Sequence, residues 1–134
     1  MADFKLFTEG ANKVLDSGLP KATKLAFALS TKTADELVAT LKGTEGGSAF
    51  GEITGTGYAR QEQEPPNAAS QKKSFAEMEW KTGVATDWPA GTKSVVCFSG
   101  TTAICGWNLQ PGGAARDMSG ANTTEKFTPI FQLS

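Results

Sequence analysis

The chain has 134 residues and a net charge of -1, and 39% of its residues are hydrophobic. A chain of this length buries about two thirds of its unfolded surface around one core, so we expect a single domain over residues 1–134. The balanced charge argues against nucleic acid and against a polybasic membrane surface as partners, since both need clustered basic side chains. No apolar run approaches the roughly 20 residues that span a bilayer, and residues 1–5 lack the basic start of a signal peptide.

Two short helices are predicted near the N-terminus. Residues 4–18 carry apolar side chains at helical spacing, and Gly18 is the expected stop. In residues 33–42, Thr33 and Glu36 have the spacing of a capping box that begins a second helix.

The remainder of the chain alternates apolar and polar residues in short runs. Residues 22–30 place Leu25, Phe27 and Leu29 on one face and form the first predicted strand. Further strands are predicted at residues 57–61, 73–80, 86–89, 94–98, 104–109 and 126–133. Because Gly, Pro, Asn or Asp separates these runs, the pattern indicates a mainly β fold. We expect one antiparallel, jelly-roll-like β-sandwich over residues 19–134, preceded by a helical segment at residues 1–18.

Long polar loops separate the predicted strands at residues 43–57, 64–73 and 111–124. Loops of this kind often carry recognition on a β-scaffold, but loops that merely tolerate change look the same in sequence. Both interpretations stay open for each loop.

Cys97 and Cys105 lie eight residues apart, on either side of a predicted turn at residues 99–103. If paired strands bring them face to face, their side chains approach disulfide distance. Two half-buried free thiols are the alternative, which suits a protein made in the cytosol. Because the chain has no histidine, the pair is a poor metal site, and we expect no metal.

A chain without histidine excludes Ser-His and Cys-His nucleophiles. Glu62 and Glu64 share a strand face, as do Glu77 and Glu79, at the separation of about 7 Å that falls within the range of glycosidase carboxylates. The solvated face of an amphipathic strand explains the same spacing. The glycine-rich turns lack the Lys-Ser/Thr of a phosphate-binding loop. We therefore expect no catalytic residue and no cofactor.

Five other side chains allow two interpretations each. Trp80, Trp88 and Trp107 are either core anchors, as tryptophans in alternating strands usually are, or a sugar-stacking platform. Tyr58 shares a predicted strand face with Arg60. These two are either a packed tyrosine beside an arginine ion pair or a contact with a neighbouring subunit.

Six short motifs follow one another along the chain, with Phe75 ahead of the third. They are Phe27-Ala28-Leu29-Ser30-Thr31, Gly57-Tyr58-Ala59-Arg60, Gly83-Val84-Ala85-Thr86-Asp87-Trp88, Val95-Val96-Cys97-Phe98, Trp107-Asn108-Leu109 and Lys126-Phe127-Thr128-Pro129. In this order they resemble a family of small bacteriophage virion proteins, labelled tail fibre, minor tail or head-associated proteins. The resemblance implies a β-sandwich with a structural role in a phage particle, assembly in the host cytoplasm and localisation in the virion.

Two functions from different classes are therefore expected. In the first, the protein is a non-enzymatic virion subunit, docked as a tail-fibre or minor tail component or as a decoration protein on the capsid. It would contact other virion proteins and self-associate through Phe4, Leu6, Phe7 and the sheet edges, with Tyr58 and Arg60 as further contact residues. In the second, it is a glycan- or receptor-binding module that uses its three polar loops.

Overall fold

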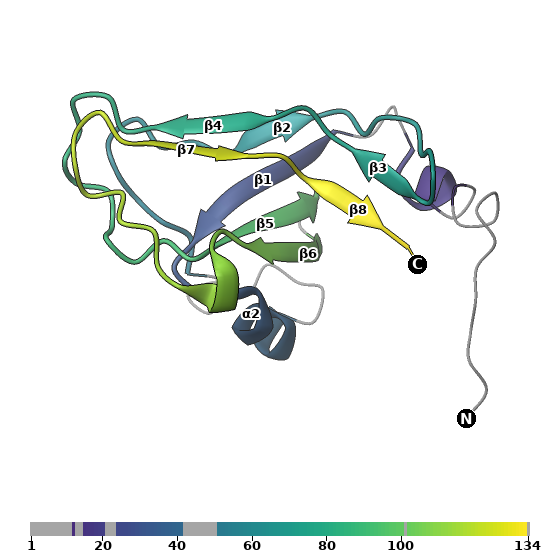
Figure 1. The fold of residues 1–134 in the computed structure, drawn as a ribbon, viewed down its shortest axis with the longest axis horizontal. Helices are drawn as coiled ribbons and strands as arrows, with labels where there is room; N and C mark the ends of the chain where they lie inside the picture. The colour runs from purple at the N-terminus through teal and green to yellow at the C-terminus, as the bar shows by residue number, and fades with distance from the viewer. Residues whose placement is uncertain (1–11, 13–14, 21–23, 42–50, 101, 134) are drawn as a thin grey trace.

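The described part of the chain is mainly β. The computed structural model describes residues 12, 15–20, 24–41, 51–100 and 102–133 (Figure 1). Its elements in chain order are β1 (Leu25–Ser30), α2 (Ala34–Leu41), β2 (Gln61–Gln63), β3 (Lys72–Ser74), β4 (Met78–Lys81), β5 (Ser94–Ser99), β6 (Thr102–Asn108), the 3-10 turn η2 (Pro111–Gly113), β7 (Thr124–Phe127) and β8 (Ile130–Gln132). The strands pair in antiparallel fashion. The prediction of a mainly β, sandwich-like fold with short helices near the N-terminus is confirmed.

The strands form one four-stranded sheet and one interrupted ribbon. The sheet has the strand order β2-β1-β5-β6. β3 pairs with β8, and β4 pairs with β7. Residues 72–81 thus run antiparallel to residues 124–132 through both pairs, and we call this two-stranded arrangement the ribbon. In Figure 1 the ribbon runs above the sheet and α2 lies below it. The arrangement therefore has three layers: ribbon, sheet and helix.

The main core fills the space between the sheet and the ribbon. Leu25, Phe27 and Leu29 reach it from β1, as their alternation predicts, and the opposite layer contributes Phe75 and Trp80. All five side chains are at most 4% exposed. Because full burial of one large apolar side chain contributes roughly 1.5–3 kcal/mol, this cluster supplies much of the drive for folding.

The other face of the sheet is buried as well, under α2. Ala28 and Phe98 pack there against Leu37 of the helix. The helix begins with the predicted capping box: the Glu36 N–H donates to Thr33 Oγ1 at 3.2 Å, and the Thr33 hydroxyl donates to Glu36 Oε1 at 3.2 Å. Local capping thus starts α2 at the place where its apolar side meets the sheet.

Side-chain amides join β2 to β4 and to the residues just before β4, in a different sheet. Gln61 Nε2 donates to the Glu79 carbonyl oxygen at 3.1 Å, and Gln63 Nε2 donates to that of Ala76 at 2.9 Å. The sheet and the ribbon are connected along this side without a backbone ladder.

The strand predicted at residues 57–61 is wrong except for its last residue, where β2 begins. The chain pairs with β1 at Glu52, leaves it as an excursion over residues 54–60, and then rejoins it as β2. Within the excursion, the Tyr58 hydroxyl accepts a hydrogen bond from the Leu29 N–H at 3.0 Å. The tyrosine side chain takes the place of a backbone hydrogen bond here. Alternation of apolar and polar residues cannot predict such a replacement.

Residues 86–89, also predicted as a strand, have irregular backbone. Side chains fix them against the excursion over residues 54–60. The Asp87 carboxylate accepts hydrogen bonds from the Thr56 N–H at 3.0 Å and from the Thr56 hydroxyl at 2.8 Å. The Trp88 indole N–H donates to the Thr56 carbonyl at 2.8 Å. The tryptophan is therefore buried without a strand to carry it.

The runs predicted as single strands at residues 73–80 and 126–133 are each split in two. Pro129 lies at the interruption, and its nitrogen has no hydrogen to donate to a ladder. Its carbonyl oxygen accepts a hydrogen bond from the Phe75 N–H at 3.0 Å. Three residues separate β3 from β4, but only two separate β7 from β8. One side of the ribbon therefore has one residue more than the other at the interruption, as in a β-bulge, and such an extra residue bends a strand pair.

The remaining predictions fall partly outside the described residues. Of the helix predicted at residues 4–18, the described residues are helical. Of the loop predicted at residues 43–57, only residues 51–57 are described. The loop predicted at residues 111–124 contains η2 and leads into β7.

A buried lysine fastens the N-terminal helical segment to the ribbon. The Lys73 side chain is 1% exposed, and its Nζ lies 2.7 Å from Asp16 Oδ1 and 2.6 Å from the Pro66 carbonyl oxygen. A buried ammonium needs such partners because the loss of water around it is costly. The prediction that residues 64–73 form a loop is wrong at its end, since Lys73 belongs to β3.

Candidate functional site

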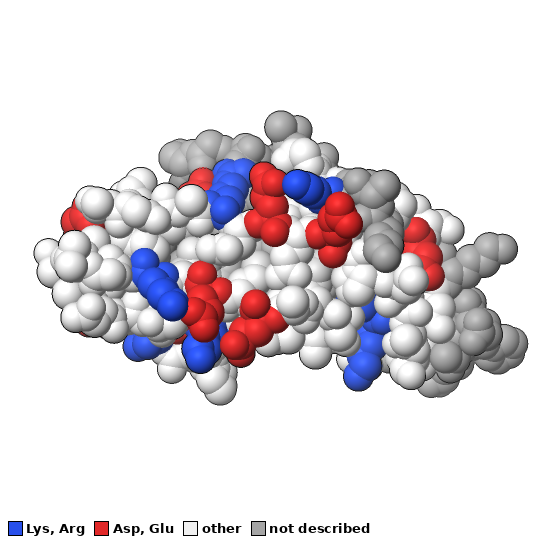
Figure 2. Space-filling view, turned by 90° about the horizontal axis from the view of Figure 1, so that it is seen from above, with Lys and Arg blue, Asp and Glu red and all other residues white. Residues whose placement is uncertain are grey.

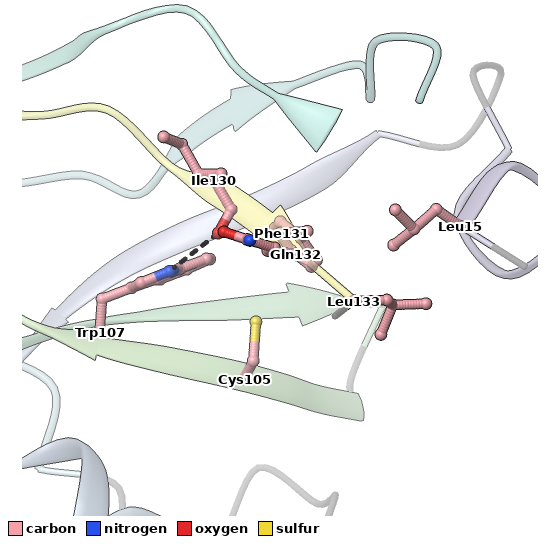
Figure 3. A pocket seen from close by; sticks show the side chains of 7 residues that line it. All are labelled: Leu15, Cys105, Trp107, Ile130, Phe131, Gln132 and Leu133. Atoms are coloured by element: carbon pink, nitrogen blue, oxygen red, sulfur yellow. Dashed lines mark hydrogen bonds between the residues drawn. The ribbon is translucent and has the colours of Figure 1, made fainter. Parts of the chain in front are cut away.

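The four-stranded sheet and the ribbon meet at an open seam between β6 and β8. β6 is the last strand of its sheet, and β8 pairs with β3, so within the described residues neither has a ladder partner on its other edge. A hydrogen bond crosses the gap, in which Trp107 Nε1 donates to the Ile130 carbonyl oxygen at 3.3 Å (Figure 3). We call this region the β6–β8 seam. Its strand edges present backbone groups that a further strand could pair with.

A pocket of about 320 Å³ opens in the β6–β8 seam. Its lining residues are Leu15, Cys105, Trp107, Ile130, Phe131, Gln132 and Leu133, whose side chains Figure 3 shows around a common space. Leu15 comes from the N-terminal helical segment, and the others come from β6 and from the end of the chain at β8. Because none of these side chains carries a charge at neutral pH, the pocket suits a neutral and mainly apolar ligand.

Aromatic contacts hold the wall of the pocket in place. The Trp107 ring centroid lies 5.2 Å from that of Phe131 and 5.3 Å from that of Phe127. Behind them, Phe75 lies 5.3 Å from Phe131 and 5.5 Å from Phe27. Rings at these separations attract one another beyond their burial alone. The pocket wall is thus continuous with the main core, which makes it a preformed surface.

The three tryptophans have different surroundings. Trp80 and Trp88 are each 2% exposed, so the core interpretation is confirmed for both. Trp107 is half-buried and lines the pocket. The described chain therefore offers one partly accessible tryptophan face instead of a platform of three.

Cys97 and Cys105 face each other on the paired strands β5 and β6, so the condition that the sequence analysis set for an approach of the two side chains is met. Cys97 is fully buried in the main core, whereas Cys105 is half-buried and lines the pocket. Both are free thiols in the structure. The hydrogen bond with Cys105, together with burial, raises the pKa of the Cys97 thiol well above its usual value.

Tyr58 and Arg60, the predicted contact residues, converge on Glu52. The Tyr58 hydroxyl donates to Glu52 Oε2 at 2.8 Å, while Arg60 donates from Nε to Oε2 and from Nη2 to Oε1, both at 2.9 Å. Burial opposes the ionisation of Glu52, but the hydrogen bonds from Arg60 and Tyr58 outweigh it and lower the pKa of Glu52. The arrangement is a packed tyrosine with an arginine ion pair. A role of either residue in a subunit contact stays a prediction.

The other predicted contact residues, Phe4, Leu6 and Phe7, lie outside the described residues. Conversely, Ile130 and Leu133 line the pocket but were not among the residues predicted for a site. The alternation at residues 126–133 predicts that the apolar side chains of this strand are buried. Whether a neighbour covers them depends on strand pairings between distant parts of the chain.

Several charged side chains form ion pairs on the surface of the described chain. Glu79 lies 3.1 Å from Lys81 and 3.6 Å from Lys126, which agrees with the solvated strand face considered for it. Figure 2 shows acidic and basic side chains interspersed over one face of the molecule. The described residues contain no group of three or more His, Cys, Asp or Glu that could hold a metal ion. None of the helices among them is long and apolar enough to cross a membrane.

Comparison of the chain with protein-family models, with curated proteins and with solved structures found no match. The geometry of the β6–β8 seam and the short motifs of the sequence are therefore the features that bear on function.

Proposed function

We propose that the chain is a non-enzymatic structural protein of a bacteriophage particle, docked on it as a tail-fibre or minor tail component. The observation that carries this proposal is the β6–β8 seam, where two strand edges frame an open apolar pocket. The order of the short sequence motifs supplies the virion context, since it resembles that of small phage structural proteins.

The occupant we propose for the seam is an extended, uncharged segment of a neighbouring virion protein. Such a segment would add a strand to the edge of β6 or β8 through main-chain hydrogen bonds. Its alternate side chains would enter the pocket against Trp107 and Ile130. The absence of charged side chains from the lining favours apolar side chains in these positions.

A matched pair of substitutions tests the docking mode. Ile130 is 41% exposed in the pocket lining, and Val84 is 94% exposed in a turn after β4, outside the lining. Ile130→Lys should abolish cosedimentation of the purified protein with particles assembled without it, because a charge would have to be buried on docking. Val84→Lys should leave cosedimentation unchanged. Equal binding by both variants would contradict docking at the seam.

Immunogold labelling of particles whose genome encodes the chain tests the location. Label on the tail supports the proposed component. Regular label over the head would favour the alternative, a decoration protein on the capsid. Unlabelled intact particles would overturn the virion role altogether.

One observation favours a second candidate, a glycan- or receptor-binding module. The half-buried Trp107 and the amide-bearing Gln132 both line the pocket, and sugars bind proteins by stacking on an aromatic ring next to polar groups. A rise in melting temperature with added saccharides, lost in Gln132→Leu, would support this alternative. No shift with any saccharide tested would leave the structural role as the better account.

A further inference from the structure

The two cysteines have the backbone geometry of a cross-strand disulfide. Cys97 and Cys105 are direct partners in the register of β5 and β6. Directly opposed residues of antiparallel strands have Cα atoms about 4.5 or 5.5 Å apart, according to the type of pair. Both values lie inside the range of roughly 4.4–6.8 Å over which disulfides form. The spacing of directly opposed residues therefore fits a disulfide at this pair, and the register of the ladder shifts directly after it, between Cys97 and Phe98.

The two thiols differ in their access to solvent. Cys97 is 0% exposed in the main core, whereas Cys105 lines the open pocket of the β6–β8 seam. In Figure 3 the Cys105 sulfur points from β6 into the space between β6 and β8. A small molecule that enters the pocket reaches Cys105 and does not reach Cys97.

From this arrangement we infer that Cys97 and Cys105 form an oxidisable dithiol site, in which a low-molecular-weight disulfide entering the seam pocket converts the pair into an intrachain disulfide. The inference concerns the chemistry of the site and does not depend on the virion role. Cys105 is the attacking residue and Cys97 the resolving residue.

The chemistry is thiol–disulfide exchange in two steps. The Cys105 thiol loses its proton, and the thiolate attacks one sulfur of oxidised glutathione, which forms a mixed disulfide and releases one glutathione. The Cys97 thiol then loses its proton and attacks the Cys105 sulfur, which forms the protein disulfide and releases the second glutathione. Two protein thiols are oxidised, and one glutathione disulfide is reduced to two thiols.

The second step is the slow one. Once Cys105 is in the mixed disulfide, Cys97 is still 0% exposed in the main core, and this burial makes its thiol harder to ionise than an exposed thiol. The mixed disulfide at Cys105 should therefore accumulate before the intrachain bond closes, and closure should become faster as the pH rises.

The test incubates the reduced full-length protein with oxidised glutathione and follows intact mass and peptide maps. We expect a transient glutathione adduct on Cys105, followed by a product lighter than the reduced protein by two hydrogens, with the two cysteine peptides joined. Cys97→Ala should stop at the adduct. Cys105→Ala should form none while folded. Adducts at Cys97 in Cys105→Ala as fast as those at Cys105 in Cys97→Ala would overturn the inference, as would a product linked only between chains.

A measurement on the unaltered protein covers the case in which a variant does not fold. Iodoacetamide should alkylate Cys105 at least about tenfold faster than Cys97, because a buried thiol reacts only after local opening. Equal rates at the two cysteines, or no reaction at either before unfolding, would overturn the assignment of Cys105 as the entry point.

Discussion

Two buried threonines show how much depends on a single hydrogen bond. Thr82 is 5% exposed; its hydroxyl donates to the Gly120 carbonyl at 2.9 Å and accepts from the Thr123 N–H at 2.9 Å. Thr92 is 0% exposed, and its Oγ1 has no hydrogen-bond partner within the described structure. A buried hydroxyl without a partner costs free energy, whereas a bonded one contributes to stability.

Valine at each position should therefore have opposite effects. Thr92→Val removes an unpaired hydroxyl at constant shape, and we expect the free energy of unfolding to stay the same or to rise by up to about 1 kcal/mol. Thr82→Val leaves the Thr123 N–H unpaired and should lower it by about 1–3 kcal/mol. Urea denaturation of both variants measures the difference. A larger loss for Thr92→Val than for Thr82→Val would show that the Thr92 hydroxyl has a partner after all.

Among the elements, the excursion over residues 54–60 is fitted closely to Trp88. A Cβ atom at Gly55 would lie 2.4 Å from Trp88 Cδ1, a distance that real side chains do not tolerate. The Tyr58 ring also packs against Trp88, and the two ring centroids lie 5.6 Å apart. Glycine is required at position 55 because the backbone itself lies against the indole.

Gly55→Ala should therefore lower the free energy of unfolding by about 1–3 kcal/mol, the usual cost of an extra carbon in a packed site. Gly91→Ala is the matched control, since a Cβ there meets nothing within 4 Å and its φ is not in the left-handed region. The control should be neutral or slightly stabilising. The melting temperatures of the two variants, compared with that of the unaltered protein, measure the difference. Equal melting temperatures for both variants would mean that Trp88 moves aside at no cost.

At the same scale, some elements could be predicted from sequence and others could not. β1, α2 and β5 carry local signals, namely alternation around Phe27 and the Thr33 capping box, and these predictions are confirmed. The strand expected around Tyr58 is absent because its hydroxyl replaces a backbone bond to β1. Lys73 gave no sign of burial, because its partners Asp16 and Pro66 come from other parts of the chain.

For the molecule as a whole, the candidate site was even less accessible from sequence than the fold. Trp107 and Cys105 attracted attention by residue type, but the pocket they share with Ile130 exists because β6 and β8 are not paired with each other. Which strand edges stay open is a property of the complete set of pairings. Alternation within one strand is the same on a central strand and on an edge.

Acid should destabilise the whole molecule through its carboxylates. The Lys73 hydrogen bond lowers the pKa of Asp16, and the contacts already described lower that of Glu52. A carboxylate whose pKa is lower in the folded state binds its proton less readily there than in the unfolded chain. Its contribution to stability is complete above the ordinary values of 3.8 for Asp16 and 4.5 for Glu52, and it is lost as the pH falls toward the folded-state values.

We therefore expect urea midpoints that are level near neutral pH and fall as the pH drops below about 5. Glu52→Gln should be less stable at neutral pH, because the Arg60 ion pair is gone. It should also lose less stability on acidification, because one titrating group has been removed. The comparison of the two pH profiles is the measurement. Parallel profiles would mean that Glu52 does not contribute to the acid sensitivity.

The hydrogen bonds that Gln61 and Gln63 make across the two layers expose the molecule to damage by deamidation. Gln61 and Gln63 hold the two layers together as donors to the carbonyl oxygens of Glu79 and Ala76. Deamidation would convert each donor into a carboxylate that can only accept, so that negative oxygen would face carbonyl oxygen. Slow chemical damage at either side chain would therefore open the molecule along this join, on the side away from the β6–β8 seam, while the backbone ladders stayed intact.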